Sequence, residues 1–163
     1  MLIVSDTTPI ISLMKTNRLE ILKELFSEII IPEAVYSELT TNEKFPDEAA
    51  QIKESSFIKT VKLADRRLID IFQRATGLDL GESEAILYSD EHKADLLMMD
   101  EAKGRSVAKQ MNIRVIGTLG ILQLANAKGR MNAQEVWHCI EVLRANERHI
   151  SDELIERLME NIK

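Results

Sequence analysis

Acidic residues stand close to the ends of short apolar segments at several places in this chain. The acids concerned are Asp6, Glu38, Glu82, Glu84 and Asp100. Carboxylates that folding gathers at one point raise one another's pKa, and a hard divalent cation relieves this repulsion. Mg²⁺ and Mn²⁺ prefer oxygen ligands, and such a centre binds phosphate esters and lowers the pKa of a bound water. The acids therefore predict a cation site that hydrolyses phosphodiesters.

The positions of two acids give this prediction its geometry. Asp6 follows the apolar segment 2–4, and Asp100 follows the segment 95–99. In open α/β sheets, ligands bind beyond the carboxyl ends of the strands. If the two segments are neighbouring parallel strands, we expect their acids to lie together at the carboxyl edge of the sheet, with the other three acids close to them.

Each acid also has a structural interpretation when it is considered alone. Asp6 is placed to cap a helix, and Asp100 to cap a loop. Glu84 suits the positive end of a helix, whereas Glu38 suits a solvated helix face. The recurrence of acids beside strand ends is what favours a shared site.

Apolar segments alternate with helical patterns along the chain, which is typical of a parallel sheet covered by helices on both faces. The expected strands are 2–4, 28–31, 95–99 and 113–116, with 57–61 as an edge strand. The expected helices are 18–26, one after Pro32, a short one within 40–56, one around 68–72 that ends near Gly77, one after Gly81, then 103–111, 118–127, 133–143 and 152–159, the last capped by Ser151. The residues 6–9 predict a turn or a helix start. We therefore predict one α/β domain with a helical C-terminal tail.

Net charge, cysteine content and the length of apolar runs limit how this protein can bind nucleic acid and where it acts. The chain has 163 residues and a formal net charge of −6, which argues against nucleic-acid binding through bulk charge. The single cysteine, Cys139, excludes an intramolecular disulfide. No apolar run reaches the ~20 residues of a membrane span, and the first residues lack the pattern of a signal peptide. We expect a cytoplasmic protein without membrane contact.

Four segments in order, 4–11, 31–39, 80–86 and 99–105, resemble the motifs of PIN-domain proteins, most closely a prokaryotic branch related to the VapC toxins. The resemblance spans about 1–129 and implies a Mg²⁺- or Mn²⁺-dependent ribonuclease. By position, Asp6, Glu38 and Asp100 match the first, second and fourth family acids. Glu84 fits the third position best, with glutamate in place of aspartate.

The third acid has a neighbour that competes for its role. Glu82 and Glu84 are two residues apart, so both cannot point the same way from a regular helix. We take Glu84 as the catalytic residue and Glu82 as a second candidate for the cation. Thr7 resembles the hydroxyl residue that follows the first family acid, and it equally suits a second helix cap.

Basic residues follow the fourth acid and could meet a phosphate backbone. Arg105, which comes after Gly104, is our first choice for substrate binding, and Lys103 is the second. An ordinary solvated helix face is the competing interpretation.

Two functions stay open at this point. The first is a metal-dependent endoribonuclease, with RNA as substrate and a small antitoxin protein as a partner if it is a toxin. The second is a non-catalytic PIN-like module that binds RNA or protein, which the Asp-to-Glu exchange keeps open. A dehalogenase-type phosphatase needs an acid at Thr8, and a phosphoacceptor receiver domain needs an Asp after its third strand. Neither pattern is present.

The C-terminal helices raise the question of a partner. We expect the PIN-like domain to span 1–129 and the helices of 130–163 to pack on that domain or on a dimer partner. Val136, Trp137, Ile140 and Leu143 form an apolar stripe that suits either use. The family resemblance favours a homodimer.

Overall fold

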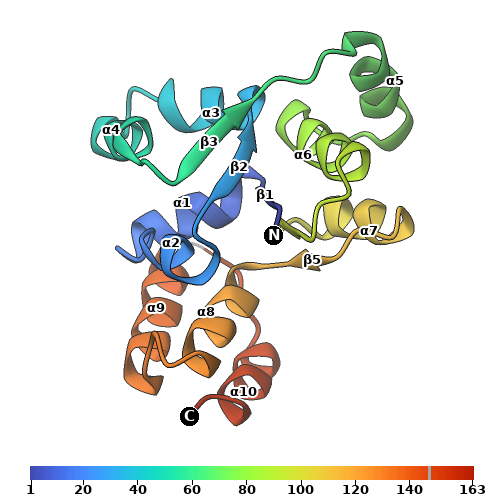
Figure 1. The fold of residues 1–163 in the computed structure, drawn as a ribbon. Coiled ribbons are helices and arrows are strands. Elements are labelled where there is room, and N and C mark those ends of the chain that lie inside the picture. Colours follow the sequence, from blue (N-terminus) through green and yellow to red (C-terminus); the bar gives the residue numbers. More distant parts are fainter. Residues whose placement is uncertain (147) are drawn as a thin grey trace.

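An all-parallel sheet of five strands runs through the computed structural model, which describes residues 1–146 and 148–163 (Figure 1). The strands are β1 (Ile3–Ser5), β2 (Ile29–Pro32), β3 (Ile58–Val61), β4 (Leu96–Met98) and β5 (Val115–Ile116). Their order across the sheet is β3-β2-β1-β4-β5. The strand β1 is therefore central, with β2 and β4 beside it, and the segments that follow these three strands emerge at one edge of the sheet.

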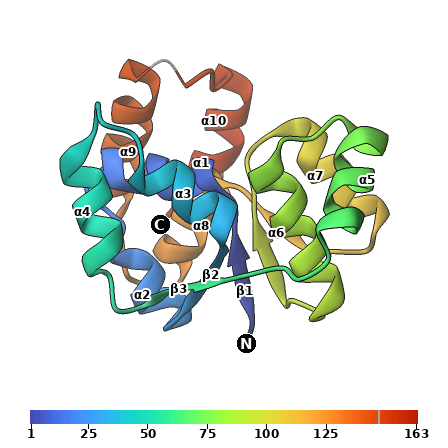
Figure 2. The ribbon, with the colours of Figure 1, turned by 90° about the horizontal axis from the view of Figure 1, so that it is seen from above.

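Ten helices surround the sheet in the described part of the chain. They are α1 (Thr7–Lys15), α2 (Ile21–Phe26), α3 (Glu33–Thr40), α4 (Pro46–Glu54), α5 (Arg66–Thr76), α6 (Leu80–Glu91), α7 (Ala102–Gln110), α8 (Thr118–Ala127), α9 (Ala133–Ala145) and α10 (Asp152–Glu160). Figure 2 shows α5, α6 and α7 on one side of the sheet, and α1, α2 and α8 on the other. The predicted parallel sheet with helices on both faces is confirmed.

The inner strands β1, β2 and β4 are largely buried on both faces because both faces are covered, whereas the edge strand β3 exposes Lys59 and Thr60. Along β1, Ile3 belongs to the core beneath α1, α2 and α8, whereas Val4 belongs to the core beneath α6 and α7. In β4, Leu97 and Met98 alternate in the same way. This period of two fixes the face of the sheet to which each side chain points.

Element boundaries differ from the expected ones in two informative places. The expected helix 18–26 begins only at Ile21, because Asn17 adopts a left-handed conformation with φ 56° and a turn follows it. Leu19 is buried within that turn. Its spacing to Leu22 therefore reflects the burial of both side chains and does not mark a shared helix. By contrast, the segment 6–9, expected as a turn or a helix start, opens the full helix α1.

The C-terminal helices share the core of the sheet. Ile140 of α9 and Leu158 of α10 are buried in the same cluster as Ile3. The last residue, Lys163, is tied to Asn126 of α8 by two hydrogen bonds of 2.9 and 3.1 Å. Trp137 departs from the expected stripe and is 40% exposed. Within the described ranges, none of the helices is long and apolar enough to cross a membrane.

Candidate functional site

Asp6 lies where β1 ends and α1 begins. Its backbone N–H donates to the carbonyl of Met98 at 2.9 Å, which fixes it against the neighbouring strand β4. Its carboxylate caps no backbone N–H of α1, although the residue occupies the N-cap position. Asp6 is only 4% exposed, and burial raises its pKa to about 7, with the charges of Asp79, Glu82 and Glu38 adding to the effect. A buried carboxylate with these neighbours favours a proton or a cation as its partner.

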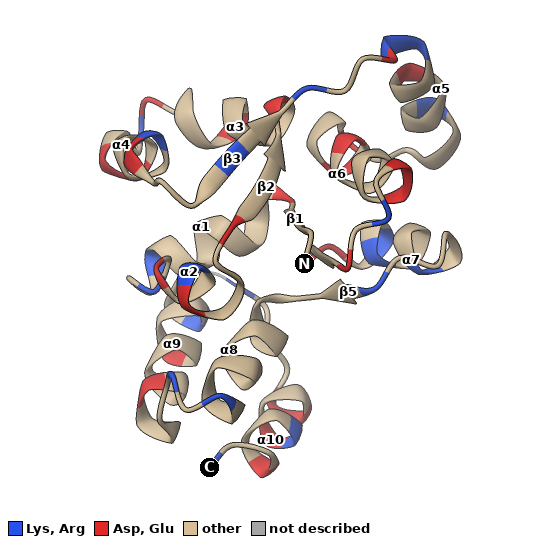
Figure 3. Cartoon of the chain, viewed as in Figure 1, with Lys and Arg blue, Asp and Glu red and all other residues tan. Residues whose placement is uncertain are grey.

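The surroundings of Asp6 form a pocket of about 390 Å³ that we call the acidic pocket. Its lining residues are Asp6, Thr7, Thr8, Ile11, Glu38, Asp79, Glu82 and Glu101. Three predicted acids therefore come together there, namely Asp6, Glu38 and Glu82, along with two that sequence reasoning did not select. Figure 3 shows acidic residues on α6 beside the basic residues of α7.

Glu38 reaches the pocket because α3 and α6 approach closely at Gly81. A methyl group at Gly81 would lie 2.5 Å from Oε1 of Glu38 and 3.5 Å from Oδ1 of Asp6. A side chain at position 81 would therefore push the Glu38 carboxylate away from its present place beside Asp6. Burial raises the pKa of Glu38, and the charges of Asp79 and Glu82 raise it further.

Glu82 is held at the start of α6 by a capping box. Oδ1 of Asp79 accepts from the Glu82 N–H at 2.8 Å, and Oε2 of Glu82 accepts from the Asp79 N–H at 3.0 Å. Burial raises the pKa of Glu82, and the Asp79 and Glu101 charges add to this. The acid-x-x-Glu spacing of a capping box was the sequence signal that could have selected both residues.

Glu84 points away from the acidic pocket. Its Oε2 accepts from the backbone N–H of Ala34 at 2.9 Å, in the first turn of α3. Its Oε1 lies 3.4 Å from Nη1 of Arg66, and the side chain is 2% exposed. As expected for residues two apart on a helix, Glu82 and Glu84 diverge, but it is Glu82 that faces Asp6. Glu84 instead satisfies a free N–H at the N-terminus of α3.

We expect Glu84→Ala to lower the free energy of unfolding by about 2 kcal/mol, because it leaves the part-buried Ala34 N–H without a partner. Affinity for Mn²⁺ should stay within about twofold of wild type, since the side chain does not line the acidic pocket. Urea unfolding and isothermal titration calorimetry with Mn²⁺ measure the two quantities. Glu84→Gln, which keeps an acceptor for Ala34, is the matched control. A large loss of Mn²⁺ affinity in both variants would show that Glu84 is a ligand of the cation.

Asp100 is engaged by other partners. Its Oδ1 accepts from the Thr118 N–H at 2.7 Å and its Oδ2 from the Thr118 hydroxyl at 2.6 Å. Oδ2 also lies 3.1 Å from Nη2 of Arg148. Asp100 lines a second pocket, of about 490 Å³, between β5, α8 and α10, whereas the next residue, Glu101, lines the acidic pocket.

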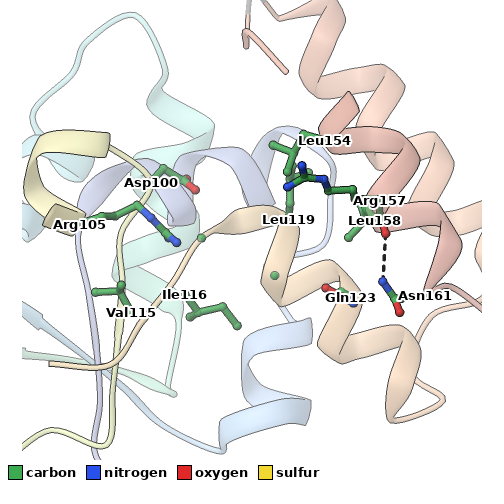
Figure 4. Close-up of a pocket in the computed structure, with 12 residues that line it drawn as sticks. Asp100, Arg105, Val115, Ile116, Leu119, Gln123, Leu154, Arg157, Leu158 and Asn161 are labelled. Atoms are coloured by element: carbon green, nitrogen blue, oxygen red, sulfur yellow. Dashed lines mark hydrogen bonds between the residues drawn. The ribbon is translucent and has the colours of Figure 1, made fainter. Parts of the chain in front are cut away.

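The other predicted residues lie around these two pockets. Arg105 lines the second pocket beside Asp100, opposite Leu154 of α10, and its Nη1 donates to the Met99 carbonyl at 2.9 Å (Figure 4). Lys103 is exposed, and its charge lowers the pKa of Glu82, against the larger effect of burial. The Thr7 hydroxyl, beside Glu38, is buried without a hydrogen-bond partner.

The acidic pocket fits a hard cation by the chemistry of its donors. They are oxygen atoms, one buried carboxylate is destabilised by its like-charged neighbours, and the Thr7 hydroxyl is unsatisfied. Within 1–146 and 148–163, no three Asp, Glu, His or Cys side chains are grouped closely enough to hold a metal ion. Glu38 and Glu101 are exposed, so their side chains are free to turn toward Asp6, whereas Asp79 is held by the capping box. The residues therefore fit such an ion in type and in location.

Comparison with known proteins places this arrangement in a family. A family model described as a PIN domain matches residues 2–163. This chain belongs to the PIN-domain family. The match includes the C-terminal helices of this PIN-domain protein, beyond the 1–129 expected from the sequence motifs. No curated protein matches the chain. PIN domains are generally nucleases and typically use divalent metal ions, which agrees with the acids found at the carboxyl edge of the sheet.

Proposed function

We propose that this PIN-domain protein is a divalent-cation-dependent endoribonuclease. The observation that carries the proposal is the burial of Asp6 at the carboxyl end of the central strand, facing the carboxylates of Glu38 and Glu82. A protein keeps a cluster of this kind at a cost in stability, which a function must justify. The family membership supports hydrolysis of a phosphodiester over other phosphate chemistry.

Mg²⁺ or Mn²⁺ bound in the acidic pocket would supply Lewis acidity and a water of lowered pKa. Asp6 would hold the cation from a fixed backbone position, and Glu38 and Glu82 would complete the oxygen ligands. Asp79 and Glu101 would orient those ligands or accept hydrogen bonds from water around them. The Thr7 hydroxyl would donate to one of the carboxylates or to water, which satisfies a group that is otherwise unpaired.

Substrate binding needs positive charge near the acids, because the chain as a whole is negative. Lys103 and Arg105 stand on the first turns of α7, directly after the acids at 100 and 101. We propose that they contact the phosphates on either side of the cleaved bond. Hydrolysis then adds water across one P–O bond and leaves one product with a hydroxyl group and the other with a phosphate.

The same proposal includes a cellular location, an oligomeric state and an inhibitory partner. The enzyme acts in the cytoplasm, it forms a homodimer, and a small antitoxin protein holds it in check if it is a toxin. They rest on the family resemblance of the motifs and on the absence of a disulfide-forming pair of cysteines.

The proposal predicts cleavage that depends on the cation. Purified protein incubated with a mixed-sequence RNA and Mn²⁺ or Mg²⁺ should yield internal fragments, and excess EDTA should abolish them. The products are resolved on a denaturing gel. The same incubation with DNA of the same sequence tests the choice of substrate. Cleavage that persists in EDTA contradicts the proposal.

A non-catalytic PIN-like module that binds RNA or protein is the second candidate. The lack of three grouped ligands among the described residues favours it. RNA binding without cleavage in every tested cation would select this function.

A further inference from the structure

A small groove adjoins the acidic pocket between α1, α3 and the start of α4. Its volume is about 120 Å³, and we call it the Phe45 groove. Its apolar residues are Ile11, Met14, Leu39 and Phe45. Ile11 and Glu38 line both this groove and the acidic pocket. A nucleic-acid chain bound at the acids would therefore reach the Phe45 groove within its neighbouring nucleotides.

Phe45 presents an aromatic ring to solvent at this groove. It is 45% exposed, whereas the other three phenylalanines of the chain are partly or fully buried. Its backbone is held on both sides, because its N–H donates to the Asn42 carbonyl at 3.2 Å and its carbonyl accepts from the Ala49 N–H at 3.1 Å. An exposed ring on a fixed backbone offers a flat apolar partner a surface at little cost in entropy.

The polar residues of the groove indicate which part of a nucleotide it suits. Glu38 and Glu48 both contribute to its lining, and their carboxylates repel a phosphate. The same carboxylates accept hydrogen bonds from the N–H groups at the edge of a base. An apolar surface with acceptors at its border therefore suits a base and not a phosphate.

A cation stands at the opening of the groove. Lys15 of α1 is exposed, and its Nζ lies over the Phe45 ring, 6.0 Å from the ring centroid. The flexible stem of a lysine lets the ammonium group move from the ring to a phosphate nearby. An aromatic face beside a positive charge is the combination by which proteins bind unpaired nucleotides.

We propose that Phe45 is a substrate-binding residue: the base of a nucleotide near the cleaved bond stacks on its ring, and Lys15 contacts the phosphate of that nucleotide. The inference rests on the proposed function, because it assumes that RNA lies across the acidic pocket. The contact is the same before and during cleavage, so it contributes to binding of the substrate and not to the rate of the chemical step.

The test is the affinity for a short single-stranded RNA carrying a fluorescent label, measured by anisotropy in EDTA so that the RNA stays intact. Phe45→Ala and Phe45→Leu should each bind about tenfold more weakly than wild type, because both lack an aromatic face. Phe45→Trp should stay within about twofold of wild type. Lys15→Gln should lower the salt dependence of binding by about one phosphate contact.

Trp137→Ala is the matched control, since Trp137 is an exposed aromatic residue of α9 that lines neither the Phe45 groove nor the acidic pocket. It should bind RNA with wild-type affinity. In Mn²⁺, Phe45→Ala should raise KM about tenfold and leave kcat within about twofold.

Replacing each nucleotide of the RNA in turn by an abasic one identifies the stacked base. One abasic position should weaken binding to wild type about tenfold and have no effect on Phe45→Ala, because the two changes remove the same contact. Equal affinity of wild type and Phe45→Ala overturns the inference, as does an equal loss in Trp137→Ala. A Phe45→Ala variant that binds RNA normally but changes its oligomeric state would assign the groove to a second copy of the chain, which also overturns it. Wild-type protein that neither binds nor cleaves RNA overturns the proposed function itself, so the two failures are distinguishable.

Discussion

Asp6→Asn is expected to slow cation-dependent RNA cleavage at least about a hundredfold while leaving the fold intact. The reason is that the fold fixes the backbone of Asp6 and buries its carboxylate. Asp6 follows the central strand, its N–H is bonded to Met98, and its carboxylate is buried among Glu38 and Glu82. Asparagine keeps the shape of the side chain and removes the charge that a cation requires.

Initial rates of RNA cleavage in saturating Mn²⁺ measure this effect, and circular dichroism checks the fold. Asp90→Asn is the matched control, because it removes one carboxylate at the exposed end of α6, outside the acidic pocket. The control should cleave at the wild-type rate. Undiminished cleavage by folded Asp6→Asn would show that the acidic pocket is not the site of reaction.

The second large effect concerns stability in the absence of divalent cations. The pKa of Asp6 is raised from 3.8 to about 7 in the folded protein, mainly by burial. Between these values the folded state binds more protons than the unfolded state, so stability falls as pH rises from about 4 to about 7. Glu38 and Glu82 have raised pKa values as well and act in the same direction.

At about pH 8 and in EDTA, we therefore expect Asp6→Asn to be more stable than wild type by roughly 2–4 kcal/mol. The difference should shrink as pH falls and vanish at about pH 3 or below, where the wild-type carboxyl is protonated in both states. Millimolar Mn²⁺ should reverse the ranking at pH ~8, because the cation binds only the folded wild type. Urea unfolding across this pH range measures each quantity. A wild-type stability that is flat with pH, or insensitive to Mn²⁺, would contradict the account.

Much of the fold could be predicted because the strands are short, all but β3 are mainly apolar, and each is followed by a helix. The position of Asp6 follows from that pattern alone, since it comes directly after a buried segment. Glu38 was found in the same way, as an acid on the helix after the second strand. At Asp6 and at Glu38, the family motif and the end of a predicted strand select the same residue.

The choice between Glu82 and Glu84 could not be made from periodicity. Residues two apart on a helix point in nearly opposite directions, and the packing of α6 against α3 decides which one faces Asp6. The capping pair of Asp79 and Glu82 was the one local clue, because it fixes where α6 begins. The partners of Asp100 could not be predicted, for a different reason. Arg148 is distant in sequence and lies in a connector without a periodic pattern.

The most direct measurement of the central claim is anomalous scattering from a crystal of the protein grown with Mn²⁺ at about pH 8, where Asp6 is ionised. We expect an anomalous peak in the acidic pocket, within bonding distance of the Asp6 carboxylate and of Glu38 or Glu82. A pocket without a peak at saturating Mn²⁺, or a peak bound elsewhere with Asp6 left unliganded, would contradict it.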